Sequence, residues 1–198
     1  MALAAIIIAT ARAPWSDAAI ALLPWNDGQS LIEFHIAQLK AAGVRDIEVV
    51  LGHDAERVIP VVSGGDTEPI VNALWEHDAA SSLRAGAAAV VRGTTAAFIV
   101  DVAEPRASAV LRALIDAHAE GDSDVTLPGF GGMHGTPLIM SDRALAALRN
   151  VRGNADQWSI VERFPDTTRV VAVESDQGLI RIGSLDDYHR AKRALGAG

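Results

Sequence analysis

The chain opens with the stretch Ala4-Ala5-Ile6-Ile7-Ile8-Ala9-Thr10-Ala11-Arg12-Ala13-Pro14-Trp15, which continues to Leu22-Leu23-Pro24-Trp25. Residues 4–9 form a short apolar run rich in β-branched side chains, a pattern typical of a strand buried on both faces. The residues after it follow no helical or strand period until the apolar residues 20–23. Because ligands of α/β proteins usually bind at the carboxyl ends of parallel strands, we expect this first loop to line the functional site.

Composition indicates a globular chain with a sizeable core. The 198 residues are 49% hydrophobic and 21% charged, which suits one folded domain over residues 1–198. The net charge of −8 argues against nucleic acid and anionic membranes as partners, because both are bound by an excess of Lys and Arg. There is no cysteine and no apolar run long enough to cross a bilayer. No basic region precedes the first apolar run, so we expect a cytoplasmic protein without a signal peptide.

Strand-like and helix-like segments alternate along most of the chain. After the first strand, the expected strands are Ile47–Leu51, Ile70–Val71, Ala97–Val102, Val125–Leu127, Pro137–Met140 and Arg169–Val173. The first expected helix opens with the capping box Ser30-Leu31-Ile32-Glu33 and stops at Gly43, and the second, Ala55–Ile59, is cut by Pro60. A third helix is expected to be capped by Ser81 or Ser82 and to run through Val91, and another to be capped by Ser141 or Asp142 and to end at Leu148. The remaining expected helices are Ala107–Ala119, Gln157–Phe164 and Ser184–Leu195. This alternation predicts an α/β fold with a mostly parallel sheet between two layers of helices.

The first loop resembles the signature of the MobA-like nucleotidyltransferases, the guanylyl- and cytidylyltransferases of the molybdenum cofactor. Their pattern L-A-A-G-x-S-x-R-M-G-x-x-K-L-L-L-P aligns without a gap from Ile8 to Pro24. Similar segments follow in the family's order: Gly43-Val44-Arg45-Asp46-Ile47, Val49-Val50-Leu51-Gly52-His53, Trp75, Ser81-Ser82-Leu83-Arg84-Ala85-Gly86, Pro105-Arg106-Ala107-Ser108, His134-Gly135-Thr136-Pro137 and Asp187-Tyr188. The resemblance therefore implies a Rossmann-like, three-layer α/β/α nucleotidyltransferase fold over nearly the whole chain.

The positions that carry the chemistry of that family are replaced in this sequence. In the first loop, the family's Gly, Ser, Arg, Gly and Lys are Ala11, Ala13, Trp15, Asp17 and Ile20. Further along, Ala103 replaces the family's magnesium-binding Asp, Thr136 a His, Asn154 an Asp, Asp156 a Gly, Trp158 an Arg, and Arg181 and Gly183 two Asp. Glycine lets backbone N–H groups approach phosphate, Arg and Lys neutralise it, and carboxylates hold Mg²⁺. Without these groups, we expect the loop to handle a triphosphate poorly.

Matching positions supply the candidate site residues. The resemblance assigns ligand binding to Thr10, Ala11, Arg12, Gly52, Ser82 and Arg84. Asp101 lies two residues before Ala103, on the same face of the expected strand, so that Asp101 and Glu104 are candidate substitutes for the lost metal ligand. Ordinary roles explain these residues as well: a strand-end acid, a solvated glutamate, a solvent-facing loop arginine, a helix cap and a surface arginine. His53, His77 and His134 lack the spacing of a shared zinc site.

Two hypotheses of function follow. The leading one is a MobA-like protein without catalytic activity or cofactor, which binds a protein partner, for instance in molybdenum-enzyme assembly, a second copy of itself, or a nucleotide or pterin in the old cleft. Four tryptophans, Trp15, Trp25, Trp75 and Trp158, are then candidates for the pocket, the core or an interaction surface. The alternative is an active Mg²⁺-dependent transferase of CTP or GTP to a phosphorylated acceptor such as molybdopterin, with Asp101, Glu104 and Arg12 in the altered site. A redesigned scaffold would show the same pattern of replacements.

Overall fold

The first strand lies at the centre of the sheet and is covered on both faces. In the computed structural model, which describes residues 2–64, 66–153, 155–174 and 179–196, β1 (Leu3–Ala9) pairs in parallel with β2 (Asp46–Leu51) and β4 (Ala96–Asp101). Ala4 and Ile6 pack into the core on one face, and Ala5 and Ile7 into the core on the other. All four are fully buried. The alternation of side chains along a strand thus lets one apolar run hold two helical layers.

In the part of the chain that the structure describes, the sheet has eight strands and is mixed, with a parallel centre. Its remaining strands are β3 (Thr67–Val71), β5 (Val125–Phe130), β6 (Met133–His134), β7 (Leu138–Ser141) and β8 (Thr168–Ala172). The order is β3-β2-β1-β4-β7-β5-β6, and β8 pairs with β5 in parallel. β7 runs antiparallel to both β4 and β5, because the chain reverses through β6. The predicted α/β fold with a largely parallel sheet is confirmed.

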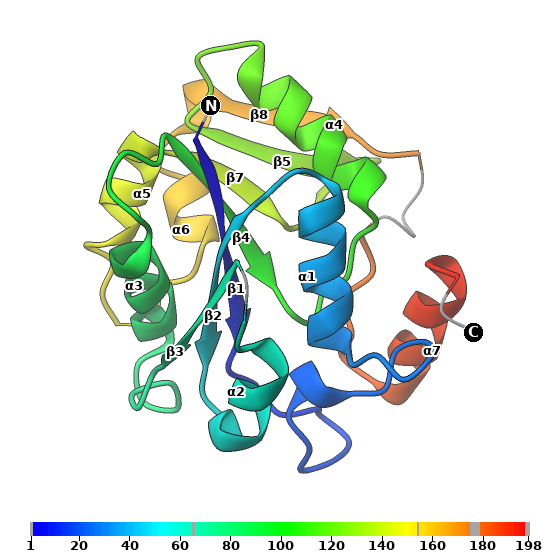
Figure 1. Ribbon diagram of the computed structural model, residues 1–198. Coiled ribbons are helices and arrows are strands. Elements are labelled where there is room, and N and C mark those ends of the chain that lie inside the picture. Colours follow the sequence, from blue (N-terminus) through cyan, green and yellow to red (C-terminus); the bar gives the residue numbers. More distant parts are fainter. Residues whose placement is uncertain (1, 65, 154, 175–178, 197–198) are drawn as a thin grey trace.

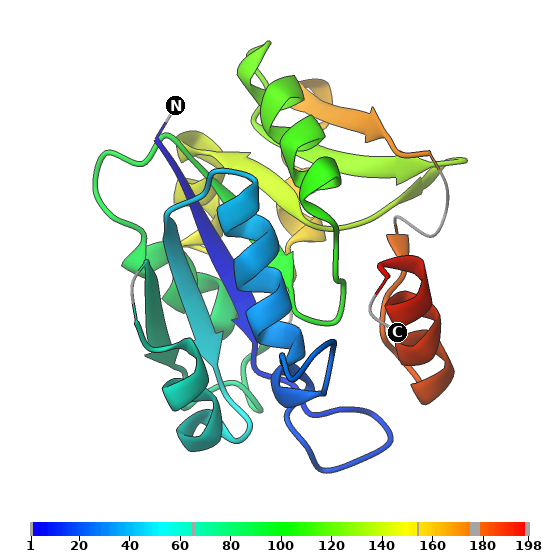
Figure 2. The same cartoon turned by 45° about the vertical axis from the view of Figure 1, so that its right-hand side comes forward.

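Helices cover both faces of the sheet (Figures 1 and 2). One face carries α1 (Leu31–Ala41), α2 (Ala55–Val62) and α4 (Ser108–Ala119), and the other carries α3 (Ala79–Ala89), α5 (Asp142–Leu148) and α6 (Trp158–Val161). Two short 3-10 helices, Ile20–Leu22 and Pro165–Thr167, lie in connecting segments. Within the described ranges, none of the helices has the length and apolar character to cross a membrane.

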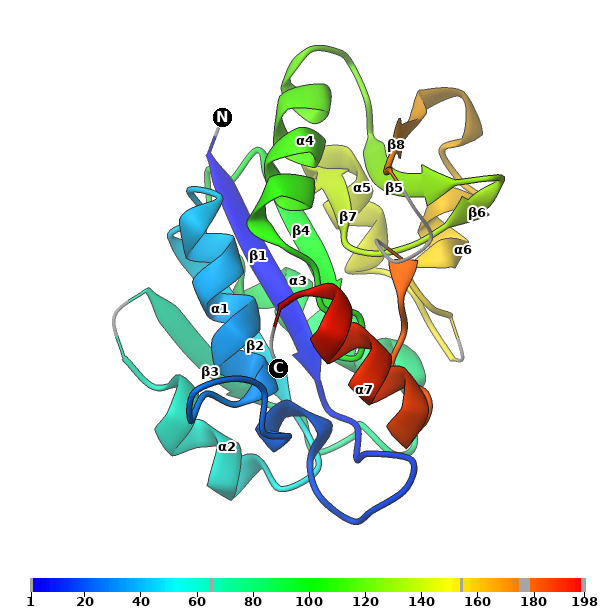
Figure 3. The ribbon, with the colours of Figure 1, turned by 90° about the vertical axis from the view of Figure 1, so that its right-hand side faces the viewer.

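The last helix packs against the loop that follows the first strand. α7 (Leu185–Ala194) lies beside this loop in Figure 3. The hydroxyl of Tyr188 on α7 donates to the carbonyl oxygen of Pro24, and the Tyr188 ring contacts those of Trp15 and Trp25 at centroid distances of 6.0 and 5.9 Å. Trp25 is a core residue, only 1% exposed. The last helix and the loop after the first strand therefore meet at the carboxyl edge of the sheet.

For two of the helices whose expected boundaries are wrong, the packing explains the difference. α3 begins at Ala79 after Asp78 instead of being capped by Ser81 or Ser82. Both serine hydroxyls lie inside the helix and accept hydrogen bonds from the amide nitrogen of Asn72, at 2.7 and 2.9 Å. An amide at the end of β3 thus satisfies the hydroxyls that a cap would have used.

The second boundary concerns α2, which continues through Pro60 to Val62 rather than ending at Ile59. Proline inside a helix removes one backbone hydrogen bond and costs about 3 kcal/mol. Val58 and Val62, on either side of it, are 0% and 2% exposed in the core, and their burial offsets this cost. Elsewhere, the third strand is longer than expected, starting at Thr67, and the helix expected over Gln157–Phe164 covers only Trp158–Val161.

A close approach between α3 and β1 gives a test of this packing. A Cβ atom at Gly86 would lie 2.2 Å from Cγ2 of Ile6, far inside van der Waals contact. We predict that Gly86→Ala lowers the free energy of unfolding by about 1–3 kcal/mol, although alanine has the better helix propensity by about 1 kcal/mol. Denaturant titration measures the change.

Ile6→Ala provides the matched background, because it removes the γ-methyl group that the new Cβ would meet. The same Gly86→Ala change should cost less there, or stabilise the protein. Equal losses in the two backgrounds would show that the steric explanation is wrong.

His35 gives a second test, because it is buried between α1 and the end of β4. It is 4% exposed, and its Nε2–H donates to the carbonyl oxygen of Val102 at 3.0 Å. Burial lowers the pKa of His35 to about 4 from 6.5, and the hydrogen bond to Val102 offsets only part of that effect. Native His35 therefore stays neutral down to about pH 4, whereas the unfolded chain takes up this proton below about pH 6.5.

We predict that acidification from pH 7 to pH 5 lowers the free energy of unfolding by about 2 kcal/mol, because His35 takes up a proton in the unfolded chain but not in the native protein. His35→Gln keeps an N–H donor but does not titrate, so the difference between its unfolding free energy and that of the wild type isolates this effect from other groups. If that difference is the same at both pH values, the buried neutral histidine is not what makes stability depend on pH.

Candidate functional site

A cavity of about 400 Å³ opens at the carboxyl ends of β1 and β4. Its wall is formed by Ile8, Thr10, Ala11, Trp75, Ala79, Ser82, Leu83, Ile99, Asp101, Ala103, Ala155, Asp156, Gln157 and Arg181. The volume is within the range of small-molecule sites, and the position is the one that parallel α/β sheets normally use for ligands. The wall combines apolar side chains with a few hydroxyl, carboxylate and guanidinium groups, as ligand pockets commonly do.

Four of the predicted ligand-binding residues belong to this region. Thr10, Ala11 and Ser82 line the cavity. Gly52 lies behind its aromatic wall, where a Cβ atom would be 2.5 Å from Cγ of Trp75. Only a residue without Cβ lets the indole ring pack this closely onto the end of β2, so Gly52 acts by placing Trp75.

The other two predicted ligand-binding residues, Arg12 and Arg84, lie outside the cavity lining. Arg12 is exposed in the first loop and its Nη1 lies 3.4 Å from Oδ1 of Asp17. Arg84 donates to the carboxylate of Asp78 at 2.5 Å and to the carbonyl oxygen of Val151 at 3.0 Å. The hydrogen bond from Arg84 lowers the pKa of Asp78. Both cations thus have partners from the chain itself.

The two candidate metal ligands are brought together, but around an arginine. Nη1 of Arg181 donates to Oδ2 of Asp101 at 2.5 Å and to Oε1 of Glu104 at 2.9 Å. The second oxygen of Asp101 accepts from the backbone N–H of Ala103 at 2.9 Å. Burial favours a lower pKa of Arg181, but the carboxylates outweigh it and raise that pKa. Arg181 is therefore a permanent cation at the point where the two carboxylates converge.

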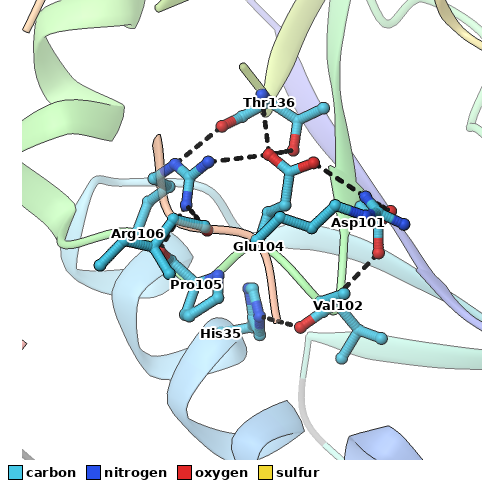
Figure 4. A network of polar contacts seen from close by, with 10 residues as sticks. His35, Asp101, Val102, Glu104, Pro105, Arg106 and Thr136 are labelled. Carbon is cyan, nitrogen blue, oxygen red and sulfur yellow. Dashed lines mark hydrogen bonds and ion pairs between the residues drawn. The ribbon is translucent and has the colours of Figure 1, made fainter. Parts of the chain in front are cut away.

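Glu104 is buried, so the alternative of a solvated surface glutamate is wrong. It is 7% exposed, and its Oε2 accepts from Nη2 of Arg106 at 2.8 Å and from the backbone N–H and hydroxyl of Thr136 at 3.2 and 3.0 Å (Figure 4). Arg106, itself 3% exposed, also donates to the carbonyl oxygens of Pro105, Thr136 and Ile180. Burial lowers the pKa of Arg106 to about 10, which leaves it charged at neutral pH. A buried carboxylate is acceptable here because hydrogen bonds satisfy both of its oxygens.

These residues do not fit the divalent metal that the resemblance implies. Mg²⁺ needs near-octahedral oxygen ligands, commonly one or two carboxylates together with phosphate oxygens and water. Every carboxylate oxygen of Asp101 and Glu104 already accepts a hydrogen bond from the chain. Across the described parts of the chain, no three His, Asp or Glu side chains are grouped as a metal site would require. In this arrangement, the guanidinium of Arg181 supplies the positive charge.

Arg181 lines the cavity although the sequence did not assign it to the site, and Trp75, one of the four tryptophans considered for the pocket, lines it as well. Arg181 is the single Lys or Arg among the described residues of the cavity wall. The sequence held one indication of this position: by resemblance, Arg181 stands where the family has an aspartate. A change from a carboxylate to a cation predicts that the side chain pairs with negatively charged groups. The replacement expected at Asn154 lies outside the described residues, whereas Asp156 lines the cavity.

Solved structures share this fold along the whole chain. Rv0371c from Mycobacterium tuberculosis H37Rv superposes with a TM-score of 0.81 at 22% identity, over 96% of this chain and 97% of that one. A nucleotidyl transferase from Methanothermobacter thermautotrophicus gives 0.81 at 22% identity, over 99% of both chains. The complex of Rv0371c with manganese gives 0.77 at 22% identity, over 98% and 99%. At these identities the likeness establishes the fold alone.

The sequence itself matches one family. No curated protein sequence is significantly similar to the chain. The MobA-like NTP transferase domain matches residues 19–170. This range begins within the first loop, after the positions where the glycines, the serine and the arginine of the signature are replaced, and it ends within β8. Because the match spans well over half of the 198 residues, the chain belongs to the MobA-like NTP transferase family.

Proposed function

We propose that this protein is a member of the MobA-like family that binds a small ligand in the cavity at the carboxyl edge of the sheet and does not transfer nucleotides. One observation carries the proposal: the cavity is retained, while Arg181 is ion-paired with both candidate metal ligands, Asp101 and Glu104. The ligand classes that the family suggests are nucleotides and pterins. In this role the protein serves a partner protein, or a second copy of itself, as a binding or scaffold component.

The reaction of the family makes demands that this wall does not meet. Nucleotidyl transfer requires neutralisation of the triphosphate charge and alignment of the acceptor with the α-phosphate. Enzymes lower such barriers by about 8 kcal/mol or more. In the first loop, the cation Arg12 is directed to Asp17, and Ala11 carries a Cβ where the family has glycine. The cavity adds the carboxylate of Asp156, which repels phosphate.

An active Mg²⁺-dependent transferase is the second candidate. The convergence of Asp101 and Glu104 on one nitrogen atom favours it, because the same two carboxylates would face a metal ion if Arg181 moved away. The manganese found in Rv0371c, a structural neighbour, is consistent with such a site in this fold. This candidate requires a nucleotide to displace Arg181.

Calorimetric titration with CTP, GTP and ATP, with and without Mg²⁺, distinguishes the two candidates. We expect no Mg²⁺-dependent binding in the micromolar range and no release of pyrophosphate over hours with a phosphorylated acceptor such as molybdopterin. The physical reason is that Arg181 already neutralises the carboxylates that a metal would need.

Asp101→Ala and Asp17→Ala form the matched pair of variants. Both remove one carboxylate at this end of the sheet, but only Asp101 lines the cavity. Mg²⁺-dependent binding that is lost in Asp101→Ala and kept in Asp17→Ala would establish the second candidate and exclude the first. Nucleotide turnover by the wild-type protein would also refute the proposed function.

A further inference from the structure

We infer that Arg181 makes this cavity a metal-independent binding site for a ligand with one compact oxyanion group, a phosphate monoester or a carboxylate, attached to an aromatic or apolar body. The inference rests on the proposed function only in using the same cavity. It goes further by naming the charge class of the ligand and the residue that selects it.

Arg181 has hydrogen-bonding capacity to spare. It contacts Asp101 and Glu104 through Nη1 alone. Its Nε and Nη2 form no hydrogen bond with other residues that the structure describes, and its side chain is 57% exposed while lining the cavity. The two N–H groups on one edge of a guanidinium match the two oxygens of a carboxylate or a phosphate. The ion pairs with Asp101 and Glu104 hold that edge in place.

The opposite parts of the wall supply hydroxyl groups and an aromatic surface. Ser82 is 4% exposed, and its hydroxyl oxygen accepts from Asn72, which leaves the hydroxyl proton available to a ligand. Thr10 offers a second hydroxyl at the end of β1, and Trp75 offers an indole ring for stacking. The cavity of about 400 Å³ is large enough for one such ligand.

The charges of the site limit the ligand to a small number of negative charges. Arg181 and Arg106 balance the charges of Asp101 and Glu104, and Asp156 on the wall adds a further negative charge. A single oxyanion group is stabilised by direct contact with the guanidinium of Arg181. A triphosphate brings several more negative charges, for which the described wall has no further cation.

The experiment is a titration of the wild-type protein in EDTA with inorganic phosphate, acetate, CMP, GMP and CTP, followed by calorimetry and tryptophan fluorescence. We expect saturable binding of CMP or GMP that is tighter than that of CTP and is unchanged by Mg²⁺. Inorganic phosphate and acetate, as competitors, show whether the phosphate or the carboxylate is the preferred oxyanion. Binding of CTP that is tighter than that of CMP and appears only with Mg²⁺ would overturn the inference.

Variants assign the effect to Arg181. Arg181→Ala should weaken binding of the monophosphate at least tenfold, and Arg181→Lys should give an intermediate loss, because it keeps the charge but not the planar pair of N–H groups. Arg57→Ala is the matched control, since Arg57 is similarly exposed at 65% and pairs with Asp54 away from the cavity wall. Unchanged binding in a folded Arg181→Ala protein, or equal losses in Arg181→Ala and Arg57→Ala, would contradict the inference. Thermal melts of each variant establish folding.

Asp101→Asn separates an oxyanion site from a metal site. The amide oxygen can still accept from Arg181, while one negative charge is removed, so affinity for the monophosphate should rise several-fold. A metal-dependent site would instead lose affinity. If the protein turned over nucleotides, the proposed function would fail, yet metal-free binding that depends on Arg181 would still stand. Absence of such binding, with no turnover, would refute this inference alone.

Discussion

The buried carboxylate of Glu104 holds the functional end of the sheet together. It follows β4, and its hydrogen bonds reach Arg106, Thr136 and Arg181, which lie in three different segments of the chain. Arg106 extends the same network to the carbonyl oxygen of Ile180. A buried charge is costly unless its partners are complete, and removal of one partner from such a network typically costs about 3–5 kcal/mol. The geometry of the cavity wall therefore depends on whether this one carboxylate keeps all of its donors.

This network also explains how two carboxylates can lie close together at the end of β4. Two carboxylates at the end of one strand repel each other unless a cation lies between them. In a metal-dependent enzyme the ion supplies that charge. Here Arg181 supplies it from within the chain. Arg181, which by resemblance stands where the family has an aspartate, therefore neutralises the repulsion between Asp101 and Glu104.

The sequence predicted the layers of this fold well, and the roles of the site residues less well. A continuous apolar run in residues 4–9 was sufficient to predict the central strand, because a strand buried on both faces is apolar throughout. The caps of α3 were misplaced, because the partner of Ser81 and Ser82 is Asn72, which no local pattern connects to them. Glu104 appeared to be a surface residue for a similar reason: apart from Arg106, its donors Thr136 and Arg181 lie 32 and 77 residues away in sequence. Propensity and spacing describe neighbours along the chain, whereas these contacts depend on the tertiary fold.

The contact between α7 and the loop after β1 affects the order in which parts of this protein can fold during synthesis. The first loop contacts Tyr188, and Asp101 and Glu104 contact Arg181, so the cavity is built from the earliest and the latest parts of the chain that the ribosome makes. Translation proceeds at about 5–20 residues per second, so β1 to β4 are synthesised several seconds before Arg181 and Tyr188. During that time the carboxylates of Asp101 and Glu104 lack their cation. A nascent chain of this kind would depend on β1, β2 and β4 for its early structure, and the cavity would be the last part to form.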